Sequence, residues 1–244
     1  MSTKGHPLTR LCWALLVWII DSPLMRAWMG SPSYFATLER RQSLWEYEQA
    51  DIQSWDTESD QEGLIEAFAL RHDDPERAVS LLFALAQEDS PIAINDIGEG
   101  YYWGKSLPCD EAEGEKWFER AFELGSRRGL LNYGKVLFYR KDLVAAEAVF
   151  RRGADGGWGP AFYWLARTEA HRDRSLKAVL RVRPYLERAA EMGSPMASEI
   201  LGGMMSAGFF GVRHMPRGMR LMSEWAPKME DLPPRKNVAG DTVH

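Results

Sequence analysis

A helix–turn–helix unit that recurs along the chain limits the fold more than any other feature of the sequence. Its clearest copy runs from Ala93 to Gly125. The first half places the small residues Ala93, Gly98 and Gly104 on one helical face, where a neighbouring helix must come close. After a break at 105–108, a second run ends at Gly125, a residue type that commonly closes a helix. Its apolar and small residues recur at helical spacing: Gly114, Trp117, Phe118, Ala121 and Phe122.

The end of this unit recurs at nearly regular steps. The segment ERAFELGS (119–126) has counterparts in RRGADGGW (151–158) and ERAAEMGS (187–194). Their closing glycines, Gly125, Gly157 and Gly193, are 32 and 36 residues apart, and a further step of 36 towards the N-terminus reaches Asp89. Small residues follow each of these four positions at the same two offsets. Repeats of this length predict an all-α solenoid, here of about five helix pairs.

Several segments resemble Sel-one-like repeats, which are close relatives of the tetratricopeptide repeat. They are AINDIGEGYYWG, DEAEGEKWFERAFELG, YLERAAEMGSPMASEILGGMMSAG and RGMRLMSEW. The family's first-helix pattern is found at Ala93, Ile97, Gly98, Tyr101 and Gly104, and its second-helix pattern at Trp117, Phe118, Arg120, Ala121, Glu123 and Gly125. The resemblance covers about residues 74–226, with a more tetratricopeptide-like unit from Gly129 to Gly157 and a weaker first helix before Asp89. It implies a right-handed solenoid and a binding scaffold, and it implies no chemistry.

Helix-start signals place the elements. Asp74-Pro75, Ser90-Pro91 and Ser194-Pro195 each combine a capping residue with a first-position proline. Helices are expected near 62–71, 75–88, 91–104, 110–124, 127–140, 142–155, 159–171, 175–192, 195–208 and 215–227. We predict a signal peptide or N-terminal apolar anchor at 1–30, an N-terminal helix and linker at 31–61, the solenoid at 62–227 and a flexible tail at 228–244.

The N-terminus contains an apolar run preceded by basic residues. Lys4 and Arg10 precede the run from Leu11 to Ile20, which Asp21 ends. About ten residues are too few to span a bilayer, but they suit the central part of a signal peptide. We therefore expect a periplasmic or otherwise exported protein that meets the membrane only through this segment. The alternative is an ordinary apolar helix on a cytoplasmic protein.

Charge is unevenly distributed along the chain, although the formal net charge is only -5. Residues 46–123 include 21 acidic and 5 basic residues, a balance of -16. Residues 127–188 include 14 basic and 6 acidic residues, a balance of +8. One interpretation is solvated faces that keep the protein soluble. The other is steering of a protein partner with the opposite pattern; no nucleic-acid partner is expected.

No catalytic or metal-binding motif stands out. The five histidines are scattered, and neither HExxH nor CxxC occurs. Cys109 follows Pro108 in a turn without a nearby histidine, which favours an inert thiol over a nucleophile. The two cysteines, Cys12 and Cys109, provide no disulfide framework. We predict a protein that is not an enzyme and uses no cofactor or metal.

These features predict a non-catalytic scaffold that recognises a partner protein, in the bacterial cell envelope, on the concave side where the first helix of each pair lies. The alternative is an immunity protein that neutralises a secreted toxin enzyme, such as a type VI secretion phospholipase effector. Exported Sel-one-like proteins include such inhibitors, and this chain is similar in size, apparent signal and repeat content.

The register of related tetratricopeptide units indicates which side chains face the groove. Carried onto this chain, it predicts partner binding by Asn95, Glu99, Tyr102, Trp103, Leu131, Lys135, Tyr139, Tyr163, Arg167 and His171. Aromatic residues and arginine most often dominate interface energies, so Trp103, Tyr139, Tyr163 and Arg167 are expected to form a continuous stripe. The methionine-rich C-terminal end is the next candidate surface.

Overall fold

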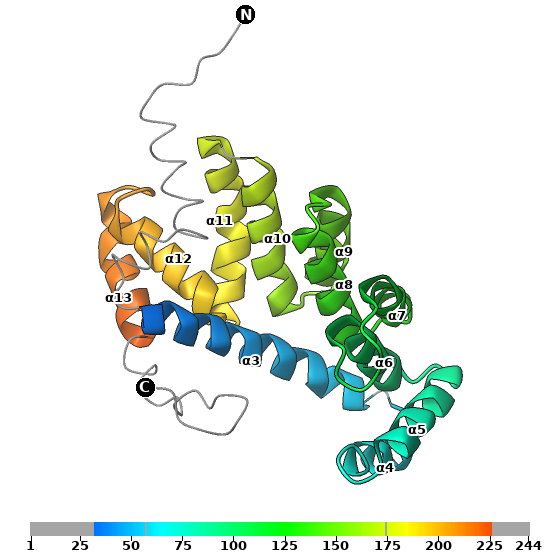
Figure 1. The fold of residues 1–244 in the computed structure, drawn as a ribbon. Helices are drawn as coiled ribbons and strands as arrows, with labels where there is room; N and C mark the ends of the chain where they lie inside the picture. Colours follow the sequence, from blue (N-terminus) through cyan, green and yellow to red (C-terminus); the bar gives the residue numbers. More distant parts are fainter. Residues whose placement is uncertain (1–31, 57, 174, 226–244) are drawn as a thin grey trace, which may run out of the picture. The chain divides into compact units, whose positions relative to one another are not determined.

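The computed structural model describes residues 32–56, 58–173 and 175–225, and every regular element in these ranges is a helix (Figure 1). The α helices are α3 (Pro32–Asp56), α4 (Gln61–Ala69), α5 (Pro75–Gln87), α6 (Pro91–Trp103), α7 (Glu111–Glu123), α8 (Arg127–Tyr139), α9 (Leu143–Asp155), α10 (Gly159–Arg172), α11 (Leu176–Glu191), α12 (Pro195–Ser206) and α13 (Met215–Trp225). A short 3-10 helix, η1 (Val212–His214), precedes α13.

The helices α4 to α13 follow the ranges expected from the sequence, with each end displaced by at most two residues. α3 is the helix expected before the first repeat. From α4 to α10, and again from α11 to α13, each helix packs against the next in the chain, for example α6 on α7 and α7 on α8. The predicted fold class, an all-α solenoid of helix pairs, is confirmed.

The chain forms two compact units, and the boundary between them crosses α3. Residues Glu46–Arg172 form what we call the central unit. The described residues of Met1–Trp45 and Asp173–His244 form the terminal unit. In the central unit α8 contacts both α6 and α10, so these three first helices of successive pairs share one side of the unit.

Side-chain caps begin the helices of the central unit. The Ser90 hydroxyl accepts a hydrogen bond from the backbone N–H of Ala93 at 3.2 Å, and the Ser126 hydroxyl accepts one from Gly129 at 3.1 Å. Such caps satisfy N–H groups that a helix start leaves without a partner. Because Ser90 and Ser126 occupy equivalent places, the caps repeat with the predicted register.

Left-handed residues end the helices at the predicted repeat boundaries. Gly125 and Gly157 have φ angles of 83° and 74°. Asp89, one step of 36 residues before Gly125, has φ 60°. Residues other than glycine seldom adopt this conformation, although aspartate tolerates it better than most. The sequence relation between Asp89 and Gly125 therefore reflects the same turn in two repeats.

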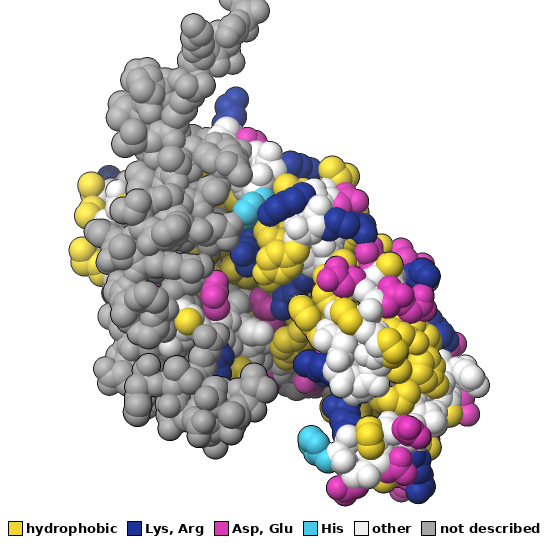
Figure 2. Space-filling view, in the orientation of Figure 1, with side chains coloured by type: hydrophobic (Ala, Val, Ile, Leu, Met, Phe, Trp, Pro, Cys, Tyr) yellow, Lys and Arg dark blue, Asp and Glu magenta, His cyan; other side chains and the backbone are white. Residues whose placement is uncertain are grey.

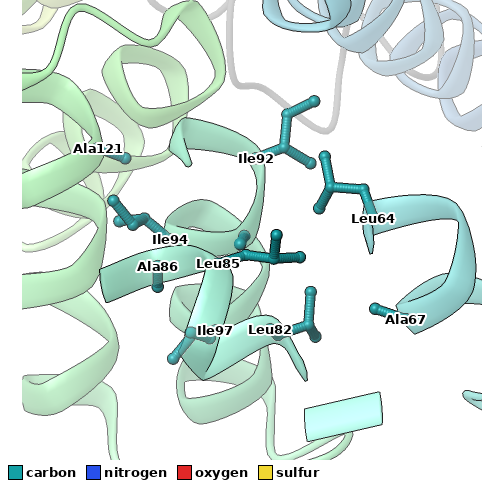
Figure 3. Packing of buried hydrophobic residues seen from close by; sticks show 10 residues of the cluster. Leu64, Ala67, Leu82, Leu85, Ala86, Ile92, Ile94, Ile97 and Ala121 are labelled. Carbon is teal, nitrogen blue, oxygen red and sulfur yellow. The ribbon is translucent and has the colours of Figure 1, made fainter. Parts of the chain in front are cut away.

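Apolar side chains from successive helices make up the core at the start of the central unit (Figure 3). The cluster comprises Leu64, Ala67, Leu82, Leu85, Ala86, Ile92, Ala93, Ile94, Ile97 and Ala121. Burial between neighbouring helices, and not around a single centre, is what a repeat architecture requires.

Glycines allow the paired helices to approach closely. A Cβ atom added to Gly98 in α6 would lie 2.7 Å from Cδ1 of Phe118 in α7. A Cβ atom added to Gly134 in α8 would lie 2.5 Å from Cε1 of Phe150 in α9. Carbon atoms in contact prefer about 3.5–4.0 Å, so each glycine creates the space for the phenylalanine ring of its own repeat.

In the terminal unit, the first part of α3 contacts α12 and the residues just before it. The Gln42 side-chain oxygen accepts hydrogen bonds from the Ser194 hydroxyl at 2.8 Å and from the Met196 backbone N–H at 3.2 Å. Trp45 Nε1 donates to the carbonyl oxygen of Met192 at 3.2 Å. Gln42 and Ser194 are buried, so these polar groups are satisfied where water is excluded.

The methionine-rich end is mostly part of this unit's packing. Met204 and Met205 are 0% exposed and Met196 is 5% exposed, whereas Met219 is 58% exposed. Flexible methionine side chains fill irregular core space well.

The predicted signal segment at 1–30 and the tail at 228–244 lie outside the described residues. The segment boundaries expected there remain predictions. Within the described ranges, no helix has both the length and the apolar character needed to cross a bilayer.

Candidate functional site

The predicted binding residues all lie on α6, α8 and α10 of the central unit. We call the side of these helices that carries Asn95, Glu99, Arg128, Asn132, Lys135 and Trp164 the first-helix face. The structure divides the predicted residues into a group that meets α3 or its neighbours, a group that is packed inside, and a group that is exposed at the helix ends. Where these side chains lie does not test whether they bind a partner, so their role in binding remains a prediction.

The C-terminal part of α3 lies on the first-helix face through polar contacts. Glu46 is only 2% exposed. Its carboxylate accepts a hydrogen bond from Trp164 Nε1 at 2.8 Å and pairs with Lys135 Nζ at 2.7 Å. The Tyr47 hydroxyl donates to the Asn132 side-chain oxygen at 3.2 Å. Lys135, which the sequence predicts as a partner-binding residue, thus pairs with a carboxylate of its own chain.

Arg128 connects α3 to the rest of the face. Its guanidinium lies 3.0 Å from an Asp51 carboxylate oxygen on α3 and 3.1 Å from a Glu99 oxygen on α6. The Asn132 side-chain N–H group donates to the Asn95 side-chain oxygen at 3.0 Å. The Asn95 side chain in turn donates to Glu99 at 3.0 Å. The predicted residues Asn95 and Glu99 therefore belong to a network that orients Arg128 towards Asp51.

The pKa values of Lys135 and Arg128 in this network are raised, so both side chains stay charged at neutral pH. Burial acts to lower the pKa of Lys135, but Glu46 and Tyr47 raise it more, so the pKa lies above its ordinary value. Burial likewise opposes the charge of Arg128, and Glu99 and Asp51 outweigh it, so its pKa is raised. Burial raises the pKa of the Tyr47 hydroxyl, which stays protonated as a donor. Beneath α3 the face thus presents two cations, Arg128 and Lys135, next to the carboxylate of Glu99.

A second group of predicted residues is packed inside the central unit. Leu131 is 0% exposed and Tyr163 is 2% exposed. The Arg167 guanidinium lies over the Phe138 ring at 5.2 Å, and the His171 ring packs edge-on against the same ring at 4.9 Å. The continuous stripe predicted from the sequence is therefore interrupted at Tyr163, because its side chain is buried between helices.

The third group forms an exposed aromatic surface, which we call the aromatic rim: Tyr102, Trp103 and Tyr139. Trp103 is 63% exposed and Tyr139 is 58% exposed. Both lie in the last turn of their helices, where α6 and α8 end. The Trp103 ring packs edge-on against Tyr102, with ring centroids 4.8 Å apart. Figure 2 shows hydrophobic side chains at the surface of the central unit, interleaved with acidic and basic ones.

Two residues of the aromatic rim, Tyr102 and Tyr139, border a hollow of about 430 Å³. Its lining consists of Tyr102, Glu111, Ala112, Glu115, Val136, Tyr139 and Arg140. The Arg140 guanidinium holds both carboxylate oxygens of Glu115, at 2.8 and 2.6 Å. Burial, followed by Glu111 and Glu115, raises the pKa of the Tyr102 hydroxyl. The hollow thus combines an aromatic edge with a polar wall, which suits protein recognition.

Sequence reasoning missed the contribution of α3 and of Arg128 and Asn132. The side chains of α3 that are buried, at 0 to 4% exposed, recur every four residues in the sequence: Leu38, Gln42, Glu46 and Ala50. Two of these residues are polar, so the stripe does not resemble an apolar helix face. Its detection from sequence would have required treating buried glutamate and glutamine as packing residues.

Ion pairs also account for part of the uneven charge distribution. Arg128, Lys135 and Arg140 come from the basic block, and their carboxylate partners Asp51, Glu46 and Glu115 come from the acidic block. This pairing within the chain gives the charge blocks a role that needs no partner.

No site for metal chemistry is apparent in the part of the chain that the structure describes, where no group of three or more His, Cys, Asp or Glu side chains is placed to hold an ion. Cys109 is an exposed thiol whose Sγ lies 3.8 Å from the Tyr102 carbonyl oxygen. The expectation that the protein is not an enzyme remains a prediction.

Comparison with known proteins identifies the fold. No protein-family model matches the chain, and no curated protein resembles it in sequence. A Sel1 repeat protein from Oxalobacter formigenes has a similar structure, with 18% identity, a TM-score of 0.59, and coverage of 78% of this chain and 84% of that chain. A protective antigen of uropathogenic Escherichia coli with an SLR fold has 17% identity and a TM-score of 0.56, over 66% of this chain and 36% of that chain.

At these identities the likeness establishes the fold alone. The chain has the fold of Sel1 repeat proteins, as the sequence pattern predicted.

Proposed function

We propose that this protein is a non-catalytic scaffold that binds a partner protein through the aromatic rim at the C-terminal ends of α6 and α8. The observation that carries the proposal is the exposure of Trp103 and Tyr139, at 63% and 58%, in a rim whose residues Tyr102 and Tyr139 line a hollow of about 430 Å³. Tryptophan and tyrosine are among the side chains that most often dominate interface energies.

Packing does not explain these two side chains. Their sequence neighbours already face inward, since Phe138 is 1% exposed and the Tyr102 ring lies 5.7 Å from the ring of buried Phe118. A tryptophan side chain offers roughly 150–250 Å² of surface, so the exposed part of Trp103 amounts to roughly 100–150 Å². At about 25 cal/mol per Å², its burial by a partner would contribute roughly 2–4 kcal/mol.

We also propose that the protein acts outside the cytoplasm. Its support is the apolar run from Leu11 to Ile20 after Lys4 and Arg10, which lies outside the described residues. The partner would then be another protein of the cell envelope, or a toxin that reaches it.

A pull-down with matched variants tests the binding surface. The baits are the tagged wild-type chain, a Trp103→Ala/Tyr139→Ala double variant, and an Ile65→Ala control. Ile65 is a suitable control because it is 60% exposed and belongs to α4 of the same unit. We expect one envelope protein, identified by mass spectrometry, with the wild type and the control, and at least tenfold less of it with the double variant.

The proposal fails if all three baits recover the same proteins in equal amounts while their melting temperatures agree. The identity of the recovered protein separates the two kinds of scaffold. An envelope or secretion component indicates an adaptor, whereas a phospholipase toxin indicates the immunity role.

A further inference from the structure

Acidic side chains of α7 border the hollow beside the aromatic rim. Glu111 and Glu115 both line this hollow, as do two tyrosines of the rim. The two glutamates are four residues apart, so they lie on the same side of the helix. Gly114 lets this part of α7 come close to α6, since a Cβ atom added there would lie 2.8 Å from the Cβ atom of Tyr102. Carboxylates and aromatic rings therefore border the same hollow.

Only one of these two carboxylates has a partner within the described part of the chain. Arg140 holds both oxygens of Glu115, at 2.8 and 2.6 Å. The neighbouring Glu113 pairs with Lys116 at 2.8 Å. Glu111 is exposed, and its carboxylate makes no ion pair or hydrogen bond with any described residue. The hollow therefore keeps one uncompensated negative charge.

The carboxylates dominate the electrostatics at the edge of the hollow. Burial raises the pKa of the Tyr102 hydroxyl most, and Glu111 and then Glu115 raise it further. Arg140 lowers that pKa, but its effect is smaller than that of either glutamate. A positively charged group would therefore be stabilised next to this tyrosine.

A partner that fills the hollow has to compensate Glu111. An apolar side chain would remove this carboxylate from water without a counter-charge, which is costly. A guanidinium can pair with a carboxylate through two N–H groups and can also stack on aromatic rings. The chain itself uses this combination at Arg120, whose guanidinium lies 2.8 Å from an Asp89 carboxylate oxygen and 5.6 Å from the ring centroid of Trp117.

We propose that the hollow beside the aromatic rim binds an arginine side chain of the partner protein, with Glu111 as its counter-charge and with Tyr102 and Tyr139 as the aromatic surfaces. The hollow's volume of about 430 Å³ is within the range of about 300–1,000 Å³ that is typical of ligand pockets. The arginine site belongs to the surface of the proposed function, on which this proposal rests. It specifies one side chain that the partner brings.

Titration of the full-length protein with a short peptide tests the site. The probe is a blocked glycine–arginine–glycine tripeptide, and its counterpart contains citrulline, which resembles arginine in shape but has no charge. NMR shifts of the Trp103 indole N–H and of the amides of residues 102–104 and 111–115 report binding. We expect saturable shifts with the arginine peptide and an affinity about fivefold lower for the citrulline peptide, because the ion pair and the cation–π contact are lost.

Matched variants assign the effect to one carboxylate. Glu111→Gln should weaken binding of the arginine peptide about fivefold, because the counter-charge is removed. Glu123→Gln is the control, since Glu123 is also exposed on α7 but lies twelve residues away, about 18 Å along the helix axis. It should bind the peptide as the wild type does. Equal affinities for the two peptides, no saturable shift with either, or unchanged affinity in Glu111→Gln would overturn the proposal.

The pull-down described above separates failure of the arginine site from failure of the proposed function. If Glu111→Gln leaves peptide binding unchanged while Trp103→Ala/Tyr139→Ala still loses the partner, the rim binds the partner without an arginine in the hollow. If the double variant retains the partner in full, the rim is not the binding surface, and both proposals fail.

Discussion

Replacing Gly134 by alanine should destabilise the central unit, although the same change in an ordinary helix is stabilising. The new Cβ would lie 2.5 Å from both Cε1 and Cζ of Phe150. Contacting carbon atoms prefer about 3.5–4.0 Å, so the ring would have to move by about 1 Å. Phe150 is 0% exposed, and its ring stacks on Trp164 with centroids 5.6 Å apart. The ring therefore has no free space to enter.

The magnitude follows from two opposing terms. Overpacking of a filled core costs about 1–3 kcal/mol, and two contacts at 2.5 Å place this site at the upper end of that range. Replacing glycine by alanine inside a helix returns about 1 kcal/mol. We expect Gly134→Ala to lower the free energy of unfolding by about 1–2 kcal/mol.

A double-mutant cycle with Phe150→Leu isolates the contact. Phe150→Leu alone should cost about 1–3 kcal/mol through lost burial and a partly filled cavity. With the smaller side chain present, the alanine at 134 has room, so the double variant should be more stable than the sum of the single effects by about 1 kcal/mol or more. The measurement is urea unfolding followed by far-UV circular dichroism.

Two results would refute this reasoning. If Gly134→Ala raises the stability by about 1 kcal/mol, the glycine is not a packing position. If the two substitutions are additive, Gly134 and Phe150 are not in contact and the repeat register is wrong.

Three further predictions follow from other parts of the molecule. Gly98→Leu and Ala121→Asp should each destabilise adjacent repeats by about 2–5 kcal/mol. The leucine would press against Phe118, and the aspartate would bury an unpaired charge at a position that is 0% exposed. Unchanged melting temperatures of both variants would contradict this prediction. Burial and a hydrogen bond to Glu119 raise the pKa of Tyr133 to about 12, whereas the pKa of an unfolded tyrosine is about 10. The free energy of unfolding should therefore fall between about pH 10 and 12, because the unfolded state loses its proton first. It should fall less in Tyr133→Phe, as measured by unfolding at each pH. A fusion of residues 1–40 to a reporter active only outside the cytoplasm should give signal, and an inactive reporter would contradict export.

The repeat elements were predictable because their signals are local. Ser90 before Pro91 fixes a helix start, and Gly125 with φ 83° fixes an end. Gly98 marks a place where α6 and α7 approach closely, since a side chain there would meet Phe118. Each of these constraints involves residues within one repeat, so a single sequence reveals them.

The arrangement on the first-helix face was not predictable by the same means. Glu46 pairs with Lys135 across 89 positions of the sequence, and a polar pair leaves no periodic apolar pattern. Tyr139 and Tyr163 are both aromatic residues on first helices, but one is 58% exposed and the other 2%. Their burial depends on which neighbouring helices cover them, and that follows from the assembled unit.

Site-specific photocrosslinking in the native cell gives the most direct test of the claim that the aromatic rim binds the partner. A photoreactive phenylalanine analogue is placed at position 103, at position 139, or at control position 65, where the natural side chains are 63%, 58% and 60% exposed. Crosslinking to one common protein from positions 103 and 139, and not from position 65, is the result we predict. Equal crosslinking from all three positions, or crosslinking from position 65 alone, would contradict the account.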